Sequence, residues 1–339
     1  MSEKRDNYFD NAKFILIVFV VIGHFIETLT QGDNLHTIYR WIYSFHMPIF
    51  VFILGYFDRR SKNSNISNYI YWFFLFQTLY FAYYYFIDKS TSAIQFTSPQ
   101  YSLWYIMACV AWKIITPRFI KLKHPIVYAF ILCLLAGYDD TISATLSLSR
   151  IIVFYPFFLL GYFCNEEVIS KIRKIPNYVS VSVLAGSYIL CYFIPSIFPS
   201  FNLGLLLHYC SYTQMGYTVW YAFIYRFFSL SISIIVSIAV MAVIPKKQTF
   251  YTKHGRNTLQ VYLIHGLIVR TLKTIGIHNV ITQTGYKALF LLGTVLLAYF
   301  LSSDTFVLVT KPFFYPSMYL YKLLPNALIR AFYRSERTL

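Results

Sequence analysis

The stretch FDNAKFILIVFVVIGHFIE, residues 9–27, decides the fold class of this chain. From Lys13 an apolar run continues to residue 30, and His24 and Glu27 are its only other ionisable side chains. About 20 residues of this kind cross a bilayer core of about 30 Å as one α-helix. The run lacks a small-residue cleavage site of the signal-peptide type, so we expect it to remain attached as a first membrane span.

The composition of the whole chain also favours a membrane protein. Of its 339 residues, 58% are hydrophobic and 21% aromatic, whereas only 12% are charged. Soluble domains carry about 25% charged residues. The net charge of +16 would suit a nucleic-acid-binding protein, but here the basic residues punctuate apolar runs instead of gathering on polar faces. We therefore predict a lipid-bilayer protein with no nucleic-acid partner.

Further apolar stretches predict an all-α, polytopic bundle of about ten transmembrane helices. They lie at residues 13–30, 41–57, 69–87, 101–116, 125–138, 149–164, 178–195, 225–244, 257–277 and 287–309. Residues 211–224 fit either an outer re-entrant segment or part of a longer helix, so the helix count around residues 196–225 stays open. With the amino terminus inside, 22 of the 29 Lys and Arg residues fall in alternate segments. The positive-inside rule then predicts that both termini are cytoplasmic.

The chain shows no linker or internal repeat that would divide it. Residues 1–314 are expected to form one transmembrane domain, and residues 315–339 a basic, aromatic tail on the inner leaflet. The cysteines lie far apart, and neither a CxxC nor an HExxH pattern occurs, so we expect no disulfide and no metal site. They are Cys109, Cys133, Cys164, Cys191 and Cys210.

Ionisable residues are costly inside a bilayer and therefore indicate function. Lys13 and His24 are eleven residues apart, close to three helical turns, so they share one face, with Glu27 near it. At about 1.5 Å per residue, His24 lies about 16 Å beyond Lys13. The next span returns from outside, which places His46 at a comparable depth. We expect two histidines and a carboxylate to converge in the outer half of the membrane.

This arrangement suits the transfer of an acyl group to an alcohol. A carboxylate beside a neutral histidine fixes its tautomer and stabilises the imidazolium as the ring takes a hydroxyl proton. His24 would then act as general base and Glu27 would orient it. The alternative is that both side chains only form hydrogen bonds between helices.

The same residues resemble a known family, the acyltransferase-3 membrane O-acyltransferases, and within it the fucose 4-O-acetylase-like branch that modifies bacterial surface polysaccharides. Its opening motif is a basic residue and a histidine with ten residues between them, here Lys13 and His24. Many members have arginine where this chain has Lys13. The lysine keeps the positive charge but lacks the bidentate fork of an arginine. The resemblance continues through SFHMPIFVFILGYF, SLWYIMACVAWKI, LSRIIVFYPFFLLGYF and GRNTLQVYLIHGLI, in that order along the chain.

The resemblance implies a multi-pass protein of the bacterial cytoplasmic membrane that acts in polysaccharide or capsule biosynthesis. Acetyl-CoA, or another acyl-CoA, would serve as donor from the cytoplasmic side, with no permanently bound cofactor, and a sugar hydroxyl as acceptor. His24 corresponds to the family's catalytic histidine, with His46 beside it. Whether transfer is direct or passes through a covalent histidine intermediate stays open, as do the acceptor sugar and the oligomeric state.

Basic residues at the inner helix ends are candidates for holding the phosphates of CoA. They are Lys13, Lys113, Arg118 and Arg256, with Asn257 beside the last. Ordinary positive-inside charge is the alternative for each of them.

The resemblance also indicates that Arg150 faces the cavity and binds the acceptor or an intermediate, with Trp104 in a matching motif. The alternatives are an arginine that reaches the membrane surface and an aromatic of the interface belt. His265 lies in a matching motif too, and it fits a helix-packing hydrogen bond equally well.

A transporter or flippase is the rival function, since ten helices with midplane charges also suit a substrate pathway. Transporters often show inverted repeats and matching broken helices. The sequence shows neither convincingly, although Pro156 interrupts one span. We therefore favour the enzyme.

Overall fold

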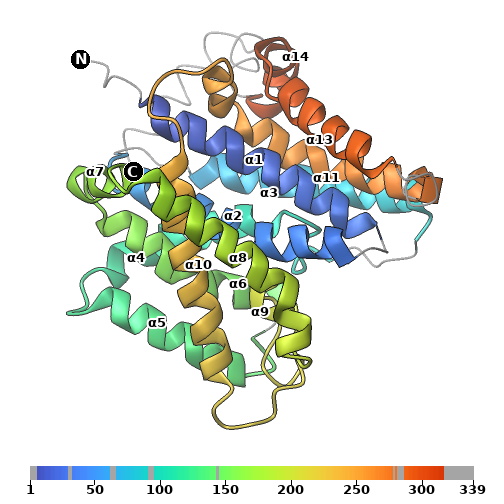
Figure 1. Ribbon diagram of the computed structural model, residues 1–339. Helices are drawn as coiled ribbons and strands as arrows, with labels where there is room; N and C mark the ends of the chain where they lie inside the picture. The colour runs from blue at the N-terminus through green and yellow to red at the C-terminus, as the bar shows by residue number, and fades with distance from the viewer. Residues whose placement is uncertain are drawn as a thin grey trace, which may run out of the picture.

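The computed structural model describes residues 6–29, 33–61, 66–90, 95–142, 145–277, 279–280 and 286–316. Within these ranges every regular element is a helix and no strand forms (Figure 1). The all-α prediction is confirmed for this part of the chain. The predicted tail, beyond residue 316, lies outside the described residues, as do Lys4 and Arg5 at the amino terminus.

A long helix occurs at each position where the sequence predicts a span. These helices are α1 Asn7–Thr28, α2 Asp33–Asp58, α3 Ile66–Tyr83, α4 Trp104–Phe119, α5 Pro125–Leu135, α6 Leu148–Phe163, α8 Asn177–Ile197, α10 Phe223–Val243, α11 Thr258–Thr274 and α13 Lys287–Leu301. Shorter elements join or extend them: η1 Tyr84–Asp88, η2 Ala136–Tyr138, η3 Thr145–Ser147, α7 Glu166–Arg173, α9 Gly204–Leu207, η4 Thr252–Arg256 and α14 Asp304–Phe314.

Five of the described helices are long and apolar enough to cross a membrane, or six if one bent pair counts as a single span. The chain is thus a helical membrane protein, while ten spans and two cytoplasmic termini stay predictions. The single helix expected at 287–309 is wrong, because α13 and α14 meet at a bend of 63°. Ser303 causes the break, since its side chain caps α14 by accepting a hydrogen bond from the Phe306 amide.

The segment at 211–224 is not part of a longer helix, because α10 begins only at Phe223. A turn at Gly216, with a φ of +89°, reverses the chain before it. The fully buried Arg226 fixes this loop by donating hydrogen bonds to the carbonyl oxygens of Cys133 and Cys210, at 3.1 and 3.0 Å. The loop is therefore anchored to the end of α5 and not extended along the bundle.

Helix α2 lies between α1 and α6, and it packs very closely against α6. A Cβ atom at Gly55 would overlap the carbonyl oxygen of Phe158, and one at Gly161 would overlap that of Phe52. Each glycine thus lies against the backbone of the opposite helix, as small residues do in membrane helix pairs. This contact fixes α2, which carries His46, against α6, which carries Arg150.

Helix α1 is buried on two opposite sides. One side packs against α3, α11 and α13, and the other against α2 and α10. Its first turns are held by the segment between α10 and η4, because the Asn11 amide donates to the carbonyl oxygens of Pro245 and Lys247 at 2.8 and 2.9 Å, and by η4 itself, whose Thr252 hydroxyl donates to Asn11 Oδ1 at 2.6 Å. Figure 1 shows α1 running through the bundle while α8 crosses the near face. Of the charged residues of α1, Asp10 is buried and Lys13 partly buried, whereas Glu27 is 44% exposed on its side chain.

Candidate active site

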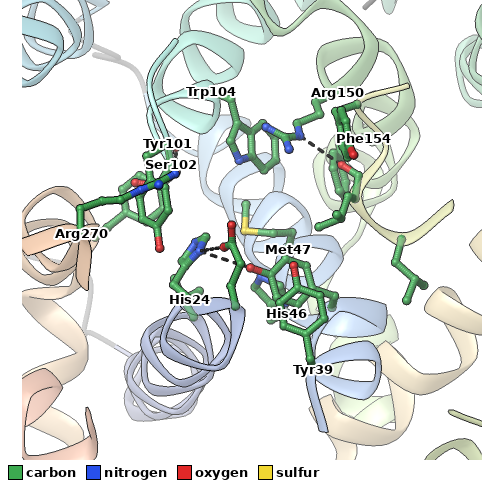
Figure 2. Close-up of a pocket in the computed structure, with 17 residues that line it drawn as sticks. His24, Tyr39, His46, Met47, Tyr101, Ser102, Trp104, Arg150, Phe154 and Arg270 are labelled. Atoms are coloured by element: carbon green, nitrogen blue, oxygen red, sulfur yellow. Dashed lines mark hydrogen bonds and ion pairs between the residues drawn. The ribbon is translucent and has the colours of Figure 1, made fainter. Parts of the chain in front are cut away.

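A cavity of about 290 Å³ lies beside the last two turns of α1, where helices α1, α2, α4, α6 and α11 meet (Figure 2). Its polar lining comes from residues far apart in the sequence. They include His24, Glu27, Tyr39, Tyr43, His46, Tyr101, Ser102, Trp104, Arg150, Tyr209, Tyr262 and Arg270. The cavity thus brings together every residue that we predicted as catalytic or acceptor-binding.

His24 and Glu27 form the expected pair. The His24 Nδ1 atom lies 3.1 Å from Glu27 Oε2 and 3.3 Å from the Tyr43 hydroxyl oxygen. Because a carboxylate only accepts, this contact places the imidazole proton on Nδ1 and leaves the Nε2 lone pair unprotonated. Glu27 follows His24 by three residues, so the two side chains are neighbours on the surface of α1. A histidine in this tautomer is equipped to take a proton from a hydroxyl group.

His46 lies close to His24, as predicted, but Tyr43 stands between them. The Tyr43 ring makes edge contacts with both imidazoles, at centroid distances of 6.2 Å to His24 and 4.7 Å to His46. The His46 Nδ1 atom is 2.7 Å from the Ile42 carbonyl oxygen, which fixes the same tautomer. His46 is only 2% exposed, so it is a buried neighbour of the reactive pair.

Arg150 faces the cavity from the side opposite His24 (Figure 2). Its guanidinium lies 5.1 Å from the ring centroid of Trp104 and 5.5 Å from that of Tyr209, and its Nε donates to the Leu207 carbonyl oxygen at 3.1 Å. Trp104 stacks on Phe154 and is buried. Arg150 is therefore not a surface-seeking arginine, and Trp104 is not an interface-belt aromatic.

The sequence interpretation missed Arg270 as a site residue. Its guanidinium lies over the Tyr101 ring at 4.8 Å, and Tyr101 is itself 4.6 Å from the His24 ring. Arg270 lies within the predicted span at 257–277. An ionisable residue inside a span is the same signal that indicated the site residues of α1. His265, one of our lesser candidates, packs 5.2 Å from His24, and its Nδ1 bonds the Val261 carbonyl at 2.9 Å. The tyrosines gave no signal, because the chain contains 32 of them.

A second cavity, of about 230 Å³, adjoins the first along α1. Met47 and Tyr262 line both cavities. Lys13 lies in the second one, and the rest of its lining is mainly apolar and aromatic. Because Lys13 and His24 share a helix face, the two cavities together follow about 16 Å of α1.

Lys13 is paired with a carboxylate. Its Nζ lies 2.8 Å from Asp10 Oδ1, and Arg256 Nε lies 3.6 Å from the other oxygen of the same group. Asp10 is only 2% exposed on its side chain, whereas Arg256 is 51% exposed. One acidic residue thus lies between two basic ones, which leaves this end of the second cavity positively charged.

The other predicted phosphate-binding residues are placed differently. Lys113 is nearly buried in an ion pair with Asp58 and lies 5.5 Å from the ring of Tyr69, which lines the second cavity. Arg118 is exposed at the end of α4 and lines neither cavity. The Asn257 amide donates to the Ser302 carbonyl and to Asp304, at 2.9 and 3.1 Å. That contact joins α11 to the bend between α13 and α14.

Among the described residues no group of three or more His, Cys, Asp or Glu side chains is arranged to hold a metal ion. All five cysteines are free thiols. The ionisable groups that the two cavities offer include the His24–Glu27 pair and the cations of Lys13, Arg150 and Arg270.

Comparisons with known proteins agree with this geometry. The acyltransferase-3 family model, described as an acyltransferase domain, matches residues 6–303. The nodulation protein NolL of Sinorhizobium fredii is 26% identical over 210 residues, which cover 56% of this chain and 57% of that protein. NolL of Mesorhizobium japonicum is 46% identical over 59 residues, 16% of each chain. The chain thus matches little more than half the length of its first curated relative, and no solved structure matches it.

The family match is not confined to one motif. It begins just before α1 and ends at the bend after α13, and so it includes every residue that lines the two cavities. With most of its length in this match, the chain belongs to the acyltransferase-3 family.

Proposed function

We propose that this protein is an O-acetyltransferase of the bacterial cytoplasmic membrane. It would move an acetyl group from cytoplasmic acetyl-CoA to a sugar hydroxyl of a surface polysaccharide or its lipid-linked precursor. The observation that carries the proposal is the pair of adjoining cavities along α1. One holds the His24–Glu27 pair, and the other ends in a cationic group.

The donor enters at the Lys13 end in this proposal. Lys13 and Arg256 share one acidic partner, Asp10, so their combined charge favours the phosphates of CoA. The narrow, mainly apolar second cavity suits the thin pantetheine arm, and its junction with the first at Met47 and Tyr262 would pass the thioester to His24. Arg118 and Arg256 line neither cavity, and only Arg256 is joined to Lys13 through a shared carboxylate, so the proposal places the phosphates at Lys13 and Arg256.

The acceptor binds in the first cavity. Trp104 offers a flat apolar surface to a sugar ring, and Arg150 lies within reach of its hydroxyl groups. The His24 Nε2 atom takes the proton of one hydroxyl as its oxygen attacks the thioester carbonyl. The carbon–sulfur bond then breaks, and the imidazolium returns the proton to the CoA thiolate. A transient acetyl-histidine would use the same residues.

Acetyl transfer by the purified protein tests this proposal. Wild type in detergent receives labelled acetyl-CoA and the lipid-linked glycans of its source membrane, and the acetyl ester is identified by NMR. We expect His24→Ala to insert normally and to lose transfer. His124→Ala is the matched control, because His124 is exposed at the start of α5. Full acetylation by the His24 variant would refute the proposal. Detergent abolishes compartments, so an acetylated product also excludes a transporter as the explanation.

A further inference from the structure

An apolar groove of about 260 Å³ lies next to the His24 cavity, between α2, α8, α9 and α10. Most of its lining is hydrocarbon or aromatic, for example Leu190, Ile194, Phe198, Phe201 and Ile232. Phe228 lines it and is 60% exposed, so the groove opens at the outer surface of the bundle. That surface is lipid-facing in the predicted topology, since only 11% of the apolar window of α8 is buried.

The groove shares lining residues with the active-site region at two places. Leu206, in the short helix α9, lines both the groove and the His24 cavity. Arg40 lines the groove and also a third cavity of about 260 Å³, which contains Glu27 and Tyr39. Those two residues line the His24 cavity as well. A molecule lying in the groove would therefore have its end beside the reactive pair.

The charge at this junction indicates what such a molecule carries. Arg40 stands where the apolar lining meets the polar one, and it is held by hydrogen bonds from Nε to the Cys191 carbonyl at 2.9 Å and from its terminal nitrogen to Thr37 at 3.1 Å. An arginine fork fixed in this way favours a phosphate. His36 and Glu27 are the other ionisable groups lining the third cavity.

We infer that the groove holds the hydrocarbon tail of a lipid-linked acceptor. The phosphate that joins tail and glycan lies at Arg40, and the sugar reaches the His24 cavity. This assignment rests on the proposed acetyl transfer, because that reaction makes the His24 cavity an acceptor site. A bulk phospholipid would need no site beside a polar reaction cavity, so the lining that the groove shares with that cavity favours the acceptor's own tail.

Photo-crosslinking tests the groove without acetyl transfer. The full chain is placed in phosphatidylglycerol nanodiscs with a long-chain polyisoprenyl phosphate that carries a diazirine in its tail. We expect crosslinks on α8 and α10. Unlabelled polyisoprenyl phosphate should remove them at a concentration about tenfold lower than the concentration of added phosphatidylglycerol that has the same effect. Equal competition by the two lipids would mean bulk-lipid occupancy and would overturn the inference. Absence of crosslinks on these helices would overturn it too.

Two neighbouring positions on α8 give a matched pair of variants. Cys191 lines the groove, so Cys191→Trp fills it and lowers crosslinking about tenfold. Ile189 is 55% exposed and lies outside the lining, so Ile189→Trp leaves crosslinking unchanged. The thermal shift produced by acetyl-CoA serves as the folding control for both. Equal labelling of the two variants would contradict the inference.

The phosphate site has its own variant. Arg40→Gln weakens crosslinking of the phosphate probe but not that of a neutral polyisoprenol with the same tail and diazirine. Equal loss of both probes would show that Arg40 only supports the groove. The His24→Ala variant keeps its crosslinks. Crosslinks without any acetyl transfer by wild type would therefore overturn the proposed function alone, and transfer without crosslinks would overturn the groove alone.

Discussion

Helices α1 and α8 have nearly the same length and apolarity but opposite roles in the bundle. Both qualify as membrane spans, with mean hydropathies of 1.8 and 1.6, yet 67% of the α1 window is buried in protein against 11% for α8. Helix α1 carries Asp10, Lys13, His24 and Glu27, whereas α8 carries no charged residue between Asn177 and Ile197. Hydropathy thus identifies a span, and ionisable residues identify the span that faces protein.

The comparison has a physical basis. Lipid solvates neither a charge nor an unpaired polar group, and on α1 Lys13 is paired with Asp10 and His24 with Glu27. On α8 the polar contacts are hydrogen bonds, such as the one that Ser187 accepts from the Trp41 indole at 2.9 Å. Substitutions on α1 should therefore alter chemistry, and those on α8 only packing or lipid binding.

The largest contrast should come from His24→Ala on α1 and Ser187→Ala on α8. We expect the first to lower kcat for acetyl transfer by about 10²- to 10⁴-fold, because the general base is lost. The second removes one hydrogen bond away from the cavities and leaves kcat within about twofold. Initial rates with labelled acetyl-CoA measure both. Comparable losses would remove the functional distinction between the helices.

Glu27→Gln should have the next largest effect. The amide keeps the size of the carboxylate but neither fixes the Nδ1 proton as firmly nor stabilises the imidazolium, so we expect kcat to fall about 10- to 100-fold. The KM for acetyl-CoA should stay unchanged, because Glu27 lies in the first cavity and not the second. A rise in KM with normal kcat would assign Glu27 to donor binding instead.

Lys13→Ala should act on the donor. The substitution removes one cation from the Lys13 end of the second cavity, and we expect the KM for acetyl-CoA to rise about tenfold, with kcat changed less. Lys13→Arg keeps the charge and should recover most of this loss. Steady-state kinetics with varied acetyl-CoA gives the result. An unchanged KM in the alanine variant would place the CoA phosphates elsewhere.

The smallest effects concern stability. Leu16 on α1 is fully buried, so Leu16→Ala leaves a cavity and should cost about 2–5 kcal/mol. Ile189 on α8 is 55% exposed, and Ile189→Ala should change stability by less than about 0.5 kcal/mol. Thermal unfolding in one detergent compares the two. Similar shifts would mean that α8 is covered by a partner that the chain alone does not reveal.

The sequence by itself determined the helical membrane class, the approximate position of most helices and the family. Apolar runs of bilayer length allow few other structures, since lipid leaves backbone groups no partner outside a helix. It also indicated that His24, Glu27 and His46 converge, because helical periodicity sets which residues share a face. The charge of Lys13 stood out because ionisable residues are costly in a bilayer, whereas Arg150 was indicated by the family resemblance.

Only the tertiary structure decided what each of these residues touches. The recruitment of Arg270 and Tyr101 and the pairing of Lys113 with Asp58 depend on contacts between distant segments. Periodicity reports one helix at a time, so it cannot tell which neighbour supplies a partner. The same limit applied to the groove beside α8, which forms from four helices, each an ordinary apolar run in the sequence.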